Sequence, residues 1–167
     1  MTRVDVRWLN EAEQTTWFRL LTLASLLPTK LDVGLRERSG VSYFEYFVLA
    51  SLSAEPDGEM RMSDLAAASA GSPSRVSHAV TRMEKNGIVE RIDSAEDGRV
   101  RIARLTEAGW ELVRRIAPAH VEQVRELIFG VITTAEMNAL GAIVGKLIRS
   151  LDEDGKVARA RGLVLDE

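Results

Sequence analysis

The stretch from Ser63 to Gly109 limits the possible folds of this chain more than any other part of it. It reads SDLAAASAGSPSRVSHAVTRMEKNGIVERIDSAEDGRVRIARLTEAG. A short apolar segment comes first, and a turn at Gly71-Ser72-Pro73 leads into a longer amphipathic segment. Two short runs with strand character follow, separated by a polar turn. Helix, turn, helix and hairpin in this order predict a helix-turn-helix with a β-hairpin wing.

Local signals set the expected boundaries within this stretch. Ser63 is the expected cap of the first helix, and Gly71 is expected to end it. Ser72 is the expected cap of the second helix, with Pro73 in its first turn, where proline costs little. We therefore expect helices over 64–70 and 73–86 and strands over 88–93 and 100–105.

Long helices are predicted before this stretch, because apolar residues recur there at spacings of three and four. The first begins near Asn10, and Pro28 is expected to kink or end it. Ser42 and Glu45 form a capping box that starts the next helix, which should end near Ser53.

Two more helices are expected after the hairpin. The first runs from Thr106 to about Phe129 and is bent at Pro118. A second capping box, Thr133 with Glu136, starts the last helix. That helix carries a coiled-coil-like apolar seam at Met137, Leu140, Val144, Leu147 and Leu151. The terminal helices are too apolar for a monomer, so we expect them to pack together and against a second copy of the chain.

Composition excludes several classes of protein. The chain of 167 residues has no cysteine, which removes disulfides, thiolate nucleophiles and thiol-based sensing. Its two histidines, His78 and His120, lack zinc-binding spacing, so neither a metal nor a cofactor is expected. With no apolar run of about 18 residues and no apolar signal core, we expect a cytoplasmic protein without membrane contact. We find no catalytic constellation, so an enzyme is not expected.

Charge is distributed unevenly, although the net charge is −3. Between Ser72 and Arg104 there are seven basic and five acidic residues, a surplus of two positive charges. The rest of the chain carries fifteen basic and twenty acidic residues. The cationic surplus thus falls on the second helix and the hairpin, where nucleic-acid contacts would lie.

The helix over 73–86 presents a polar face. Val76, Val80 and Met83 are expected to face the core. Arg75 and His78 are placed to donate to guanine, whereas Arg82 and Lys85 suit backbone phosphates. The candidate DNA contacts are Ser72, Ser74, Arg75, Ser77, His78, Thr81, Arg82 and Lys85. The alternatives are an ordinary solvated face and, for His78, a pH sensor or metal ligand.

The hairpin turn supplies a second candidate contact. Arg99 at its tip can enter a narrow minor groove, where the negative potential is enhanced, and Arg101 follows it on the returning strand. Asp97 would repel phosphate, so we expect it to hold an arginine by a charge-assisted hydrogen bond. The alternative is a simple turn with exposed charges.

These residues resemble the MarR family of winged-helix transcription regulators. The resemblance is carried by MSDLAAASAGSPSRVSHAVTRMEKNGIVER, by Asp97-Gly98-Arg99 and by RLTEAG at 104–109. It implies an obligate homodimer that binds double-stranded DNA as a sequence-specific regulator, here expected to be a repressor. It also implies that 73–86 is the recognition helix and that Arg99 is the minor-groove arginine. A second hypothesis is a protein-interaction module built on the same fold.

The resemblance also implies a domain division and a ligand. We expect an arm and dimerisation helix over 1–41, a DNA-binding domain over 42–106, dimerisation helices over 107–152 and a flexible tail over 153–167. Family members commonly bind a small aromatic anion between the dimerisation helices and the winged helix, which weakens DNA binding. Candidate residues for such a cleft are Trp17, Tyr43, Phe44 and Phe47, although each could equally belong to the core.

Overall fold

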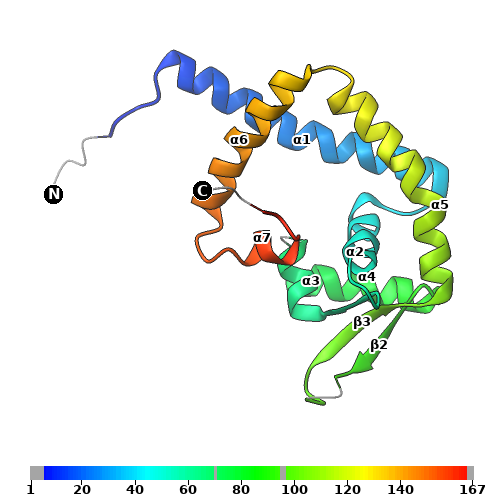
Figure 1. Cartoon of the computed structure of the whole chain (residues 1–167). Helices are drawn as coiled ribbons and strands as arrows, with labels where there is room; N and C mark the ends of the chain where they lie inside the picture. Colours follow the sequence, from blue (N-terminus) through cyan, green and yellow to red (C-terminus); the bar gives the residue numbers. More distant parts are fainter. Residues whose placement is uncertain (1–5, 70, 95–96, 165–167) are drawn as a thin grey trace.

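The structure is a computed structural model that describes residues 6–69, 71–94 and 97–164. The predicted class, mainly helical with a small β-hairpin in a winged helix-turn-helix, is confirmed (Figure 1). The elements are α1 (Glu11–Ser39), α2 (Tyr43–Ser53), β1 (Glu59–Arg61), α3 (Met62–Ala68), α4 (Pro73–Lys85), β2 (Val89–Asp93), β3 (Arg101–Leu105), α5 (Glu107–Val124), the π-helical segment η1 (Arg125–Phe129), α6 (Thr134–Leu151) and α7 (Lys156–Ala160).

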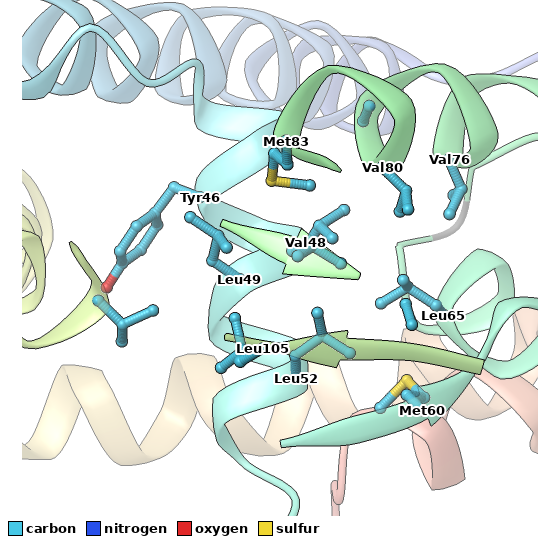
Figure 2. Packing of buried hydrophobic residues seen from close by; sticks show 14 of the residues in the cluster. Tyr46, Val48, Leu49, Leu52, Met60, Leu65, Val76, Val80, Met83 and Leu105 are labelled. Atoms are coloured by element: carbon cyan, nitrogen blue, oxygen red, sulfur yellow. The ribbon is translucent and has the colours of Figure 1, made fainter. Parts of the chain in front are cut away.

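The core of the winged domain fixes α4 against α2. Val76, Val80 and Met83 of α4 pack in one buried cluster with Val48 and Leu49 of α2 (Figure 2). Each such side chain contributes about 1.5–3 kcal/mol when fully buried. The polar face of α4 is therefore held in one orientation by the apolar contacts on its opposite side.

A three-stranded antiparallel sheet of order β1-β3-β2 completes this domain. The Nε of Arg104 on β3 donates to Glu90 on β2 at 2.8 Å, and its Nη1 donates to Glu59 on β1 at 3.1 Å. One guanidinium thus joins all three strands, and these two carboxylates raise its pKa. The β2–β3 hairpin projects away from the helices (Figure 1).

One expected helix cap is wrong. Arg61, the last residue of β1, directly precedes α3, so Ser63 lies inside the first turn and does not cap the helix. Of the two alternatives expected at Pro28, a kink or the end of the helix, the second is wrong, because α1 continues to Ser39. The turns after Pro28 are held by tertiary contacts, because Leu31 and Leu35 are buried and outweigh the one hydrogen bond that proline removes.

The C-terminal helices leave the winged domain and turn sharply. α5 with η1 makes an angle of 95° with α6, and Pro118 lies inside α5. The predicted capping box of Thr133 and Glu136 is present at the start of α6. No residue of α6 is buried in the single chain. Within the described residues no single helix meets the length and hydropathy of a membrane span, and only this bent pair of helices does so jointly.

Part of the segment expected to be a flexible tail forms the helix α7. α7 packs against α3, and Ala158 of α7 is buried (Figure 1). The Nε of Arg161 donates to the carbonyl of Ala68 at 2.6 Å, and its guanidinium lies 4.8 Å from the ring centre of Phe47. The Asp152 carboxylate accepts from the amides of Val157 and Ala158, which starts α7. These long-range contacts join α7 and the residue after it to α2 and α3.

Candidate nucleic-acid interface

α4 begins and packs as its sequence predicts. The hydroxyl of Ser72 accepts from the amide of Arg75 at 3.2 Å, and Pro73 occupies the first turn. The hydroxyl oxygen of Ser72, a predicted DNA contact, is therefore occupied as the helix cap, although the residue is exposed. The remaining polar residues divide into two flanks and an outer stripe.

One flank of α4 faces α2. The guanidinium of Arg75 lies 4.1 Å from the ring centre of Phe44. The Nε of Arg82 lies 3.1 Å from Oε1 of Glu45, whose side chain is only 15% exposed. Glu45 also completes the capping box of α2 with Ser42. Both predicted DNA-binding arginines thus have contacts within the chain, while their side chains stay solvent-accessible.

The other flank of α4 faces β2 through Arg91. Its Nη1 donates to Glu84 at 2.5 Å. Its Nη2 donates to the Ser77 carbonyl at 2.8 Å and to Oγ1 of Thr81 at 2.9 Å. Arg91 is not among the residues that the sequence predicts to contact DNA. No short-range sequence pattern predicts these contacts, because the partners of Arg91 lie 7 to 14 positions before it in the chain.

An outer stripe remains between the two flanks. Because a helix turns about 100° per residue, Ser74, His78, Thr81 and Lys85 lie along one line, opposite the buried side. Ser74, His78 and Lys85 are exposed and Thr81 is half-buried. The stripe offers hydroxyl, imidazole and ammonium donors, which are suited to phosphate oxygens and base acceptors.

The hairpin turn places Arg99 in solvent. The Asp97 carboxylate accepts from the backbone amide of Arg99 at 2.9 Å, and not from a guanidinium as expected. Asp97 therefore shapes the turn at the backbone. Arg101 pairs with Asp93 at 2.5 Å on an exposed surface, where such a pair adds little stability. Among the described residues, none pairs with the side chain of Arg99.

An open cleft of about 1000 Å³ lies between α1, the start of α2 and α4. Tyr43 and Phe44, two of the four candidate cleft residues, line it together with the outer stripe. Trp17 and Phe47 do not line it: Trp17 is exposed on the first half of α1, and Phe47 packs against the core. On the α1 side, hydrogen bonds from Arg36 and from the Tyr43 amide lower the pKa of Asp32.

His120 of α5 lies at the junction with α1 and α2. Its ring centre is 4.3 Å from that of Tyr46 and 6.4 Å from that of Tyr43. Its Nδ1 is buried without a hydrogen-bond partner among the described residues, and burial lowers the pKa of the imidazole. A cavity of about 50 Å³ adjoins it.

Comparison with known proteins points to one family. The family model described as MarR family matches residues 41–100. The transcriptional repressor MprA of Escherichia coli K12 is 28% identical over 124 residues, which cover 72% of this chain and 70% of MprA. The HTH-type transcriptional repressor MdtR of Bacillus subtilis is 30% identical over 127 residues, which cover 75% of this chain and 79% of MdtR.

Solved structures give the same result over a longer stretch. Sco3205, a MarR family transcriptional regulator from Streptomyces coelicolor crystallised in complex with DNA, is 38% identical with a TM-score of 0.84. The match covers 89% of this chain and 92% of Sco3205. AbsC, a MarR family regulator from the same organism, is 36% identical with a TM-score of 0.80, covering 89% of this chain and 97% of AbsC.

Proposed function

This chain belongs to the MarR family of transcriptional regulators, and we propose that it acts as a homodimeric repressor that binds a near-palindromic DNA site. The observation that carries this proposal is the outer stripe of α4, whose donors stay open to solvent while both flanks of the helix are anchored. A helix held in this way can insert into a major groove without ordering itself first. The DNA complex of Sco3205 supports the same use of the fold.

The proposed dimer is supported by apolar surface that the single chain leaves uncovered. The α6 seam is 39% to 85% exposed, at Met137, Leu140, Val144, Leu147 and Leu151. On α1, Trp17, Phe18 and Leu26 are 48%, 57% and 55% exposed. Contiguous apolar surface on a soluble protein often marks an interface. We therefore assign 1–41 and 107–152 to dimerisation and 42–106 to DNA binding.

In this arrangement two α4 helices enter successive major grooves, about one helical turn apart. Arg99 of each wing enters the flanking minor groove. If each protomer neutralises about three or four phosphates, the logarithm of affinity falls with the logarithm of salt concentration at a slope of roughly −5 to −7.

Selection of bound sequences from a randomised duplex pool tests this proposal. The proposal predicts enrichment of an inverted repeat at low salt, and the matched variant His78→Ala should enrich a different sequence. A pool that yields no enriched sequence would overturn it. The protein-interaction hypothesis also predicts that no DNA sequence is enriched. It predicts in addition that the chain captures a partner protein and that Arg75→Glu and Arg99→Glu abolish this capture.

We further propose that the cleft beside α4 holds a small aromatic anion that releases the protein from DNA. Tyr43 and Phe44 supply aromatic walls, and Arg36 and Arg75 supply positive charge. A molecule placed there would lie beside the outer stripe and compete with DNA. Small aromatic acids screened for release of the DNA complex test this, with Tyr43→Ala expected to raise the concentration needed. Release that is unchanged in Tyr43→Ala would exclude this cleft.

A further inference from the structure

Thr81, at the inner edge of the outer stripe, has an unusual hydroxyl environment for a helical residue. Serine and threonine hydroxyls within helices commonly donate to the carbonyl of the preceding turn. In this chain Thr22, Ser25 and Thr29 of α1 do so at 2.7–2.9 Å. Among the described residues no such bond joins Thr81 to the carbonyl of Ser77.

Arg91 accounts for the missing bond. A carbonyl oxygen has two lone pairs, and in a helix one of them accepts the amide four residues on. The Nη2 of Arg91 lies 2.8 Å from the Ser77 carbonyl and takes the second. The same nitrogen donates to Oγ1 of Thr81 at 2.9 Å. Thr81 therefore accepts from Arg91 and has no local acceptor for its own proton.

The position of Arg91 is itself fixed. Its side chain is only 22% exposed, and its Nη1 bonds to Glu84 on the same flank of α4. A planar guanidinium held at one end by a carboxylate presents its other donors in a set direction. A lysine has a single nitrogen, so it could not bond Glu84 from one nitrogen and the Ser77–Thr81 pair from a second.

We propose that Arg91 is a positioning residue that makes the hydroxyl of Thr81 a dedicated hydrogen-bond donor to DNA. The acceptor is either a phosphate oxygen or a purine N7, both of which accept from a hydroxyl. This inference rests on the proposed function and specifies how one residue of the outer stripe acts. Arg91 itself acts through Thr81 and need not touch DNA.

The experiment uses the duplex that the full-length wild-type chain enriches from a randomised pool. Each purine is replaced in turn by its 7-deaza analogue, and each phosphate by a methylphosphonate. For wild type, several positions in each half-site should be sensitive, and one of them, the position contacted by Thr81, should weaken binding about threefold to tenfold, the value of one hydrogen bond. A 7-deaza effect identifies a base contact, and a methylphosphonate effect identifies a phosphate contact.

The variants separate positioning from general structure. Thr81→Val should bind about threefold to tenfold more weakly and lose sensitivity at that one position, whereas Thr81→Ser should retain it. Arg91→Met should lose sensitivity to the DNA substitution at the same position, although Thr81 is intact. If Arg91→Met does not fold, Arg91→Lys replaces it in this test. The matched control Glu84→Gln keeps an acceptor for Arg91 and should retain the sensitivity.

Two outcomes would overturn the inference while the protein still binds DNA. The first is a folded Arg91→Met or Arg91→Lys variant that keeps the wild-type sensitivity at that position. The second is Thr81→Val that matches wild type at every position. Failure of the wild type to enrich any sequence is a different result, because it removes the proposed function and this inference with it.

Discussion

Replacing Gly109 with alanine tests the junction between α5 and the winged domain. A Cβ at position 109 would lie 2.2 Å from the carbonyl oxygen of Ile88, where real Cβ atoms essentially never come closer than 3.0 Å. The two must therefore separate by at least about 0.8 Å, the difference between these distances. The Ile88 carbonyl cannot move freely, because it accepts from the amide of Thr106 at 3.2 Å and from its hydroxyl at 3.1 Å.

The size of the effect follows from three contributions. Overpacking costs about 1–3 kcal/mol, and weakening two hydrogen bonds costs about 0.5–1.5 kcal/mol each. Alanine returns about 0.5–1 kcal/mol, because it favours the helix over glycine. Gly109→Ala should thus lower the free energy of unfolding by roughly 1–5 kcal/mol, which lowers the Tm by about 2–20 °C at this chain length.

Calorimetry and urea unfolding measure this change. Gly98→Ala is the control, because its new methyl group meets no described atom within 4 Å, and it should change stability by less than about 0.5 kcal/mol. A Gly109→Ala variant as stable as wild type would refute the packing of α5 against the turn before β2.

Three further predictions follow from other contacts. Arg161→Ala should lower the free energy of unfolding by about 1–2 kcal/mol, because it removes a charge-assisted hydrogen bond to α3 and the contact with Phe47. Equal stability of Arg161→Ala and the surface control Lys156→Ala would exclude a stabilising role for these two contacts. Arg99→Ala should weaken binding to all sequences and make the salt slope shallower by about one, and a loss confined to a single sequence would contradict a minor-groove role. Burial lowers the pKa of His120, so the unfolded chain binds the proton more readily, and the free energy of unfolding falls as the pH drops below about 6.5. Urea unfolding at pH 5 and pH 7 measures this loss of stability, which should be smaller in His120→Phe than in wild type. An equal loss in both proteins would assign the pH dependence to other groups.

The sequence predicts those features that short-range chemistry sets. The caps at Ser42, Ser72 and Thr133 are confirmed, because each depends on residues within three positions. The buried face of α4 is confirmed as well, since helical periodicity alone places Val76 and Val80 on one side. The resemblance to the MarR family is confirmed by relatives that match most of the chain.

Features that depend on distant contacts were beyond local sequence analysis. The partners of Arg91 and Arg161 lie on other elements, and no spacing rule connects them. α1 continues past Pro28 because burial of Leu31 and Leu35 compensates for the proline. α7 lies in the segment expected to be a flexible tail, and it packs against α3, which lies far from it in the sequence. The roles of individual DNA-facing residues, Arg99 among them, stay predictions.

Footprinting of the enriched duplex tests the central claim most directly, with dimethyl sulfate as the probe of guanine N7 in the major groove and hydroxyl radicals as the probe of the minor groove. The mass of the complex is measured by sedimentation equilibrium. We predict two chains per duplex, with contacts in two major grooves about one helical turn apart and flanking minor-groove protection that Arg99→Ala removes. A single chain per duplex, or protection that leaves the major grooves open, would contradict binding through paired α4 helices.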